Sequence, residues 1–245
     1  MKFTIISLFP EYFQSYLDMG IIKRALDDGF LEVELVNLRD YSLDKHKKAD
    51  DYPFGEGPGM VLMAQPALDA LEGRSHPRIH LSPRGELLDQ AKVKALADNR
   101  EITILCSHYE GLDQRVIDTA IDEEISIGDY ILSGGEMAAV ILMDAVIRLI
   151  PGVINKDSVE EESHEEGLLE YHQYTRPRVF RDLEVPEILF SGHHEKIRLY
   201  RLEESIRLTM KRRPDMIEKG LASGTYNEEV LKLIEKIREE ERNEL

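Results

Sequence analysis

The stretch ISIGDYILSGGEM, residues 125–137, decides the fold of this 245-residue chain. It begins as a short apolar run with β-strand character (125–127) and breaks into a Gly-Asp-Tyr turn (128–130). A second apolar pair leads to Ser-Gly-Gly (133–135) and directly into the most hydrophobic helical pattern of the chain. Because glycine permits positive φ and close backbone approach, this junction predicts a tight loop between a strand and a helix.

Strand and helix patterns alternate on the N-terminal side of this junction. Helical patterns of about 10–15 residues between strands predict parallel βαβ units, hence an α/β domain. The expected strands are Phe3–Phe9, Leu31–Val36, Arg78–Leu81, Ile102–Cys106 and Glu124–Ile127, and the expected helices are 10–26, 87–97 and 113–121.

Two other loops, SPRG (82–85) and SHYEG (107–111), share this make-up and also follow expected strands. The carboxyl ends of parallel strands meet at one edge of a sheet, where α/β proteins bind ligands. Backbone groups of such loops fit the edge of an adenine, whereas a Gly-Gly pair at a helix N-terminus also fits a phosphate. No Lys or Arg follows that pair, and neither a dinucleotide fingerprint nor a P-loop motif occurs. The three loops together predict a small-ligand site.

The helical pattern at 134–150 is apolar on nearly every side, which predicts a buried helix. Its polar residues, Glu136, Asp144 and Arg148, are spaced by multiples of four and therefore lie on one stripe. A polar stripe on a buried helix requires partners or a ligand. Two interpretations stay open: an internal ion pair between Asp144 and Arg148, or a stripe that lines a cleft.

Pro151-Gly152 ends this helix, and the polar, acidic stretch that follows, 155–166, is typical of a linker. Beyond it, helical patterns at 193–213 and 227–244 predict a small, mainly helical domain. We therefore expect an α/β domain at 1–154, a flexible linker at 155–170 and a helical C-terminal domain at 171–245.

The net charge of −17 argues against a general affinity for nucleic acid. Residues 174–213, however, carry ten Lys and Arg against six Asp and Glu, a local balance of +4. This basic segment fits either a polyanion-binding surface or a solvated helix face.

The single cysteine, Cys106, excludes an internal disulfide. Its place in an apolar strand favours a buried thiol over a nucleophile. We find neither a signal-peptide pattern nor an apolar run long enough to span a membrane. These features predict a cytoplasmic protein.

Six longer motifs are specific in combination: LSPRGELLDQ (81–90), CSHYEGLDQR (106–115), ISIGDYILSGGE (125–136), DAVIRLIPGV (144–153), GLLEYHQYTRP (167–177) and VPEILFSGHHEKIRLYR (185–201). With SLFPEYF (7–13) and MKRRPDM (210–216), they resemble the bacterial tRNA (guanine-N1)-methyltransferases. That family methylates N1 of the guanosine at position 37 of tRNA, next to the anticodon. The similarity covers nearly the whole chain apart from its acidic tail.

This resemblance implies the SPOUT fold, in which the carboxyl-end loops of a parallel sheet form a deep trefoil knot that binds S-adenosyl-L-methionine. Ser107 and His108 stand where the family more commonly has Gly-Arg. The cofactor-binding residues that the resemblance implies are Leu81, Ser82, Pro83, Ser107, Tyr109, Glu110, Gly111, Ile127, Gly128, Asp129, Tyr130, Ile131, Leu132, Gly134, Gly135 and Ala138.

The resemblance also assigns catalysis to two residues. Arg148 falls where the family has its catalytic arginine, which suits charge that gathers on guanine O6. The family's general base is an aspartate in the linker, and alignment on Ser163 puts Glu162 at that position, with Glu161 as the alternative.

The resemblance further implies a homodimer with the active site across its interface, and a dependence on Mg²⁺ at an unknown site. Adjacent His193 and His194 point apart on a helix, so we expect polar surface or RNA contact rather than metal binding there. The expected tRNA-binding residues are Arg176, His193, Lys196, Arg201, Arg212 and Arg213. Two alternatives remain: a methyltransferase of the same fold that acts on ribosomal RNA, and a non-enzymatic RNA- or cofactor-binding relative.

Overall fold

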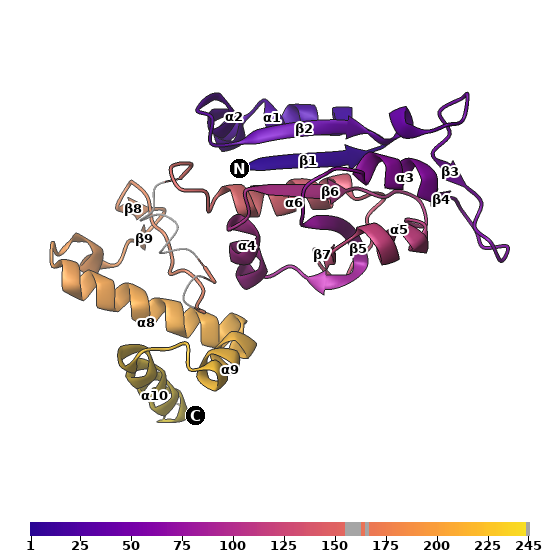
Figure 1. The fold of residues 1–245 in the computed structure, drawn as a ribbon. Helices are drawn as coiled ribbons and strands as arrows, with labels where there is room; N and C mark the ends of the chain where they lie inside the picture. The colour runs from indigo at the N-terminus through magenta and orange to yellow at the C-terminus, as the bar shows by residue number, and fades with distance from the viewer. Residues whose placement is uncertain (155–162, 165–166, 244–245) are drawn as a thin grey trace. The chain divides into compact units, whose positions relative to one another are not determined.

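The structure is a computed structural model that describes residues 1–154, 163–164 and 167–243 (Figure 1). The chain divides into two compact units, Met1–Lys156 and Asp157–Leu245. The predicted base Glu162, its alternative Glu161 and part of the predicted linker lie outside the described residues.

The first unit is built around a five-stranded sheet with the strand order β2-β1-β6-β5-β7. Every neighbouring pair is parallel, which confirms the expected α/β class. A short antiparallel pair lies outside this sheet. The sheet strands are β1 (Lys2–Ser7), β2 (Glu32–Asn37), β5 (Arg78–Leu87), β6 (Glu101–Leu105) and β7 (Glu123–Ser126), and the short pair is β3 (Asp50–Asp51) with β4 (Val61–Leu62).

Helices cover both faces of the sheet. They are α1 (Gln14–Leu17), α2 (Gly20–Asp27), α3 (Ala64–Leu71), α4 (Gln90–Ala97), α5 (Gln114–Ala120) and α6 (Glu136–Ile147), with short 3-10 helices η1 (Pro10–Phe13) and η2 (Leu38–Tyr41). Successive strand residues point to opposite faces. Ile5 of β1 therefore joins one buried cluster with α2, α4 and α6, and Ile6 joins another with α3 and α5.

The expectation of one helix at 10–26 is wrong. The segment forms η1, α1 and α2 instead. Met19 is extended, with φ −130° and ψ 155°, and Gly20 has φ 62°. The backbone therefore turns where α2 begins, and a continuous helix cannot pass through this point.

β5 continues beyond Leu81, its expected end, and pairs with β7 on both sides of an irregularity. Leu81 and Glu86 both lie opposite Ile125 of β7, so the residues between them loop out of the ladder. A Cβ on Gly85 would lie 2.4 Å from backbone atoms of β7, which leaves room for glycine alone. The expected helix start at 87 is wrong for the same reason, because this strand pairing holds residue 87 and α4 begins at Gln90.

α6 is buried as expected along most of its length. Leu142, Met143 and Val146 are fully buried, whereas Met137 and Ile141 are 47% and 43% exposed and lie four residues apart on one side of the helix. Across the described residues, no helix has the length and apolar composition that a membrane span requires.

The second unit contains α8 (His194–Arg212) and α10 (Glu228–Asn243) where helical patterns are predicted, with α9 (Pro214–Ser223) between them. Ahead of them come β8 (Val179–Phe180), β9 (Leu183–Glu184) and the 3-10 helix η3 (Glu187–Phe190). This unit has its own buried cluster, which includes Leu168, Tyr226 and Ile234. The Tyr226 hydroxyl lies 2.9 Å from the carbonyl oxygen of Gly167 and so joins residue 167 to the helices.

Candidate active site

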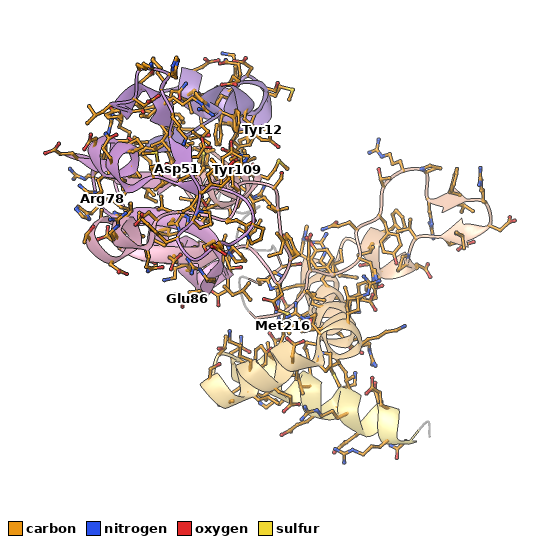
Figure 2. The ribbon with its side chains drawn as sticks, turned by 90° about the vertical axis from the view of Figure 1, so that its right-hand side faces the viewer. Tyr12, Asp51, Arg78, Glu86, Tyr109 and Met216 are labelled. Carbon is orange, nitrogen blue, oxygen red and sulfur yellow. The ribbon has the colours of Figure 1, made fainter. Side chains whose placement is uncertain are left out.

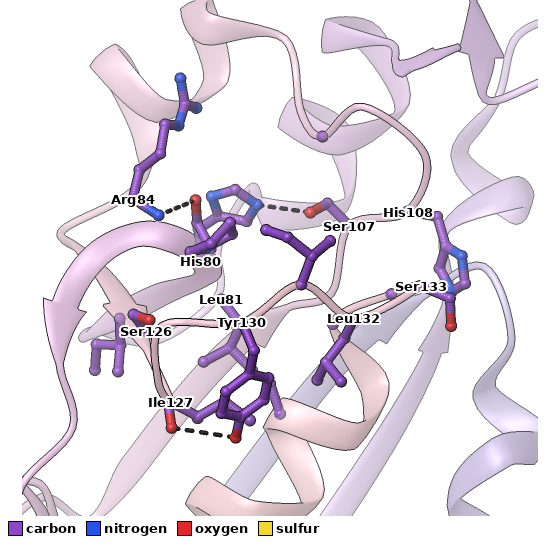
Figure 3. A pocket seen from close by; sticks show the side chains of 18 of the residues that line it. His80, Leu81, Arg84, Ser107, His108, Ser126, Ile127, Tyr130, Leu132 and Ser133 are labelled. Carbon is purple, nitrogen blue, oxygen red and sulfur yellow. Dashed lines mark hydrogen bonds between the residues drawn. The ribbon is translucent and has the colours of Figure 1, made fainter. Parts of the chain in front are cut away.

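A cavity of about 340 Å³ opens where three loops meet at the carboxyl edge of the sheet (Figure 3). One loop, 82–85, interrupts β5, the second, 107–111, follows β6, and the third, 127–135, follows β7. The Gly135 N–H donates to the carbonyl of Ser107 at 2.8 Å and joins the third loop to the second. A cavity of this size and position suits a small ligand.

The structure brings all the predicted cofactor-binding residues to this cavity except Asp129, which does not line it. All but Ile125 of the residues that the sequence did not single out are adjacent in sequence to a predicted one. His80, which precedes Leu81 within a strand, gave no signal of its own as a polar site residue. These additional lining residues are His80, Arg84, His108, Ile125, Ser126 and Ser133.

The turn at 127–130 folds tightly on itself. Gly128 has φ 150°, and a Cβ there would lie 2.4 Å from the ring of Tyr130. The Tyr130 hydroxyl donates to the carbonyl of Ile127 at 3.3 Å (Figure 3), and its N–H donates to the carbonyl of Gly128 at 2.9 Å. The glycine thus lets an aromatic ring pack on its own turn at the edge of the cavity.

The loop after β6 is fixed by residues near β4. The Glu110 N–H donates to the carbonyl of Met60 at 2.9 Å, and β4 bridges the loop at Leu112. Tyr109 has φ 59°, a left-handed conformation that is uncommon for a residue with a side chain. Tyr109 can be found by its label in Figure 2, which also labels Asp51 of β3, the strand that pairs with β4. Strained backbone of this kind concentrates at binding sites.

Glu136, in the first turn of α6, is 3% exposed and is satisfied by two partners. The Ser7 hydroxyl donates to one carboxylate oxygen at 2.6 Å, and Nε2 of His108 lies 2.7 Å from the other. The His108 ring also packs edge-to-face on Phe9, with the ring centroids 4.9 Å apart. A Cβ on Gly134 would lie 2.3 Å from His108 Nε2. The His108 ring therefore packs directly against Gly134, and a larger residue at this position would displace it.

His80 links two neighbouring strands on the floor of the cavity. Its Nδ1 lies 3.0 Å from a carboxylate oxygen of Glu124, and its Nε2 lies 2.9 Å from the hydroxyl of Ser107 (Figure 3). The side chain is 2% exposed. Burial lowers the pKa of His80, and Glu124 opposes that shift only in part.

Cys106 is fully buried at the end of β6. Burial, with a further contribution from the nearby carboxylate of Glu136, raises the pKa of its thiol well above the usual value. A protonated, inaccessible thiol is a poor nucleophile. The structure therefore supports the interpretation of Cys106 as a packing residue.

Arg148, the predicted catalytic arginine, is the half-buried residue that caps α6. Its backbone N–H donates to the carbonyl of Asp144 at 3.2 Å, and it does not line the cavity. The Tyr16 hydroxyl donates to the Asp144 carboxylate at 3.4 Å, so this position of the polar stripe also meets a partner.

Six of the basic residues of the second unit fall into two groups. Arg198 pairs with Glu195 and Glu229, Arg207 with Glu203 and Glu240, and Arg213 with Asp215. Arg176, Lys196 and Arg212 form no ion pair with any residue in the described ranges. The second group therefore presents the more available positive charge.

A second cavity, of about 460 Å³, lies within the second unit between residues 171–178 and the start of α8. Two of the arginines that line it stack on aromatic rings. Arg178 lies 4.6 Å from the ring centroid of Phe190, and Arg201 lies 4.7 Å from that of Tyr171. Of the expected tRNA-binding residues, Arg176 and Arg201 line this cavity, and His193 precedes α8.

The parts of the chain that the structure describes contain no group of three or more His, Cys, Asp or Glu residues placed to hold a metal ion.

A family model described as tRNA (Guanine-1)-methyltransferase TrmD matches residues 1–219. The chain is 50% identical over 228 residues to a tRNA (guanine-N(1)-)-methyltransferase of Clostridioides difficile, which covers 90% of this chain and 99% of that relative. A relative of the same name from Caldicellulosiruptor saccharolyticus is 51% identical over 221 residues, 89% of this chain and 90% of its own length. A third, from Fusobacterium nucleatum, is 46% identical over 244 residues, 100% of this chain and 99% of its own length.

Proposed function

The chain belongs to the tRNA (guanine-1)-methyltransferase family, and on this premise we propose that it transfers a methyl group from S-adenosyl-L-methionine to N1 of guanosine 37 in tRNA. One observation carries the proposal further than the family match. The three loops that meet at the cavity all lie within the matched residues and come from the carboxyl edge of a parallel sheet. This is where α/β enzymes bind their ligands.

The cavity residues fit the chemistry of S-adenosyl-L-methionine. Backbone groups of the turn at 127–132 suit the edge of the adenine, and the side chains of Leu81, Tyr130 and Leu132 offer apolar surface to its ring. When bound, the cofactor supplies a methyl group activated by a sulfonium ion. The role of this chain is then to hold the cofactor, exclude water and position the guanine.

The trefoil knot is part of the same proposal. The close contact of Gly85 with β7 and the hydrogen bond from Gly135 to Ser107 support it, because a knotted chain requires loops that pass one another without intervening side chains. Knots are nearly absent among proteins, so the knot rests on the family and on these contacts rather than on general rules of topology.

Two residues carry the proton and charge chemistry in this proposal. Glu162 accepts the proton of guanine N1 as the ring nitrogen attacks the methyl carbon. The guanidinium of Arg148 donates hydrogen bonds to guanine O6, where negative charge gathers. The Mg²⁺ that the family resemblance implies has no ligand group among the residues that the structure describes.

The proposed assembly is a homodimer in which the cavity of one subunit works with the Glu162 of the other. Its support is apolar surface that a single chain leaves exposed around α6. Ile131 is 80% exposed and Leu132 41%, next to the exposed Met137 and Ile141 of that helix. Exposed large apolar side chains gathered on one helix and the loop before it are typical of a protein–protein interface.

The second unit binds the tRNA in this proposal. Phosphate contacts from basic residues would position the RNA without reading its sequence. Arg176, His193, Lys196, Arg201, Arg212 and Arg213 remain the proposed contacts, although the pairing of Arg213 with Asp215 makes it the weakest of them. Because its substrate is tRNA, we place the enzyme in the cytoplasm.

The test is transfer of a labelled methyl group to two tRNA transcripts that differ only in guanosine or adenosine at position 37. We expect methylation of the first transcript only, and a loss of about 10²- to 10⁴-fold in kcat for Glu162→Gln. Full activity of Glu162→Gln would move the base to Glu161. Methylation of ribosomal RNA alone, or cofactor binding without any turnover, would overturn the tRNA proposal.

A further inference from the structure

Three polar side chains form one hydrogen-bond chain across neighbouring strands beneath the cavity. His80 lies on β5, the strand between β6 and β7, and pairs in register with Glu124 of β7. Ser107 follows β6 on the other side. The first link, from Glu124 to His80, measures 3.0 Å. The second, from His80 to Ser107, measures 2.9 Å and is drawn in Figure 3, so the two links run from the outer strand to the cavity.

The chemistry of the three groups fixes the direction of these hydrogen bonds. A carboxylate only accepts, so Nδ1 of His80 must carry the proton that faces Glu124. A neutral imidazole then has a lone pair at Nε2, and the Ser107 hydroxyl must donate to it. Burial lowers the pKa of His80 and so keeps the ring neutral at pH 7.

These hydrogen-bond directions determine what the Ser107 hydroxyl can offer to a ligand. Its single proton is committed to His80, so toward the cavity its oxygen presents only lone pairs. Both Ser107 and His80 line the cavity. A ligand can satisfy this oxygen only with an N–H or O–H donor.

We propose that Ser107 Oγ accepts a hydrogen bond from an N–H or O–H group of the bound cofactor, and that His80 and Glu124 are positioning residues that fix the hydroxyl as an acceptor. The inference rests on the proposed function, because it takes S-adenosyl-L-methionine as the ligand. Two parts of that molecule carry such donors, the adenosine and the amino-acid ammonium.

The order carboxylate, imidazole, hydroxyl also occurs in hydrolase triads, where the imidazole takes the serine proton and becomes charged. In this chain burial opposes a charged His80. The chain of hydrogen bonds therefore serves to orient Ser107 rather than to activate it as a nucleophile.

The experiment measures ligand binding by calorimetry, without turnover. S-adenosylhomocysteine carries both candidate donors, and 5′-methylthioadenosine lacks the amino-acid part. We expect Ser107→Ala to weaken S-adenosylhomocysteine binding by about five- to tenfold, the effect of one hydrogen bond. Ser223→Ala, in the second unit, is the matched control and should leave the affinity unchanged.

The second ligand identifies the donor. An equal loss for 5′-methylthioadenosine places the donor on the adenosine, and a loss confined to S-adenosylhomocysteine places it on the ammonium. Unchanged affinity of Ser107→Ala for both ligands would overturn the inference. A wild-type chain that binds neither ligand would instead overturn the proposed function, and covalent labelling of Ser107 by a fluorophosphonate would favour a nucleophile.

A double-mutant cycle tests the positioning role. His80→Phe should weaken S-adenosylhomocysteine binding about as much as Ser107→Ala does, and the double variant should be no weaker than either single one. A structural effect of His80 would instead add to that of Ser107, which would overturn its role as a positioning residue. Glu124→Ala, at a partly exposed site, gives the same cycle if His80→Phe does not fold.

Discussion

At the scale of single residues, Glu136 shows how a charged group is accommodated beside the cavity. Both carboxylate oxygens have a protein partner, and the side chain lies in the first turn of α6. The positive end of a helix dipole favours a negative charge there. The carboxylate therefore connects β1, the loop after β6 and the N-terminus of α6.

Removing this carboxylate should destabilise the fold. Glu136→Ala leaves the Ser7 hydroxyl without its buried acceptor and opens a small cavity, so we expect the free energy of unfolding to fall by about 2–4 kcal/mol. Urea denaturation measures the change. The control is Glu86→Ala, an exposed carboxylate paired with Lys92, for which a change below about 1 kcal/mol is expected. Equal losses in the two variants would contradict this account of Glu136.

His80 should make the stability depend on pH in a defined window. The unfolded histidine takes up a proton below its ordinary pKa of 6.5, whereas burial lowers the pKa in the folded protein. The contribution of His80 is therefore present above pH 6.5 and is lost as the pH falls toward the lowered pKa.

The measurement is urea denaturation at pH 7.5 and 5.5. We expect wild type to lose more stability between these values than His80→Phe does, since that variant no longer contains the titrating ring. His46→Gln, which changes an exposed loop residue, should behave as wild type. A pH dependence in His80→Phe equal to that of wild type would show that another group is responsible.

The sequence predicted one of these two buried polar residues, Glu136, and missed the other, His80. It singled out Glu136 as a polar residue on a buried helix, but its partner Ser7 is 129 positions away and no local pattern connects them. His80 was not predicted at all, because an apolar strand gives no sign that one of its residues bonds to two neighbouring strands. The make-up of the cavity loops and their position after expected strands predicted the small-ligand site, and motif similarity named its residues, whereas the buried polar contacts beneath the loops required the structure.

At the scale of elements, the loop within β5 depends on one small residue. Gly85→Ala would place a methyl group 2.4 Å from the backbone of β7, and neither strand can yield without breaking their pairing. We expect a loss of at least about 3 kcal/mol in the free energy of unfolding.

Thermal denaturation with and without S-adenosylhomocysteine would measure this loss and show whether the cavity survives. Gly57→Ala is the control, because its added Cβ would meet only the Pro53 side chain at an ordinary 3.4 Å. A Gly85→Ala protein as stable as wild type would mean that the two strands separate more easily than the structure indicates.

At this scale, hydrophobic periodicity predicted the α/β class and most strands of the sheet. It failed where pairing between residues far apart in the sequence sets the end of an element. β5 extends beyond Leu81 because β7, some 40 residues later, offers it a partner again after the loop. The helix expected at 10–26 breaks at Met19 and Gly20, because the extended backbone of Met19 and the positive φ of Gly20 are incompatible with a continuous helix.

At the scale of the whole molecule, an acidic chain must bind an acidic polymer. The net charge is −17, so the available basic residues of α8 and its surroundings have to supply a local attraction. Each phosphate contact releases counterions and makes the affinity for tRNA depend on salt.

Two arginines of α8 give a matched test of this dependence. Arg212→Ala should reduce the slope of log affinity against log salt by about 0.7–0.9. Arg198→Ala should reduce it less, because Glu195 and Glu229 already neutralise that guanidinium. Filter binding of tRNA across a salt series measures both slopes, and equal reductions would show that these ion pairs open when tRNA binds.

The strand order β2-β1-β6-β5-β7 also has a consequence for the nascent chain. β1 emerges first from the ribosome, yet one of its two neighbours, β6, begins at Glu101. At about 5–20 residues per second, translation leaves that edge of β1 unpaired for roughly 5 to 20 s. An apolar strand with one open edge is a template for aggregation, so the N-terminal segment of this protein should need chaperone protection until β6 has emerged from the ribosome.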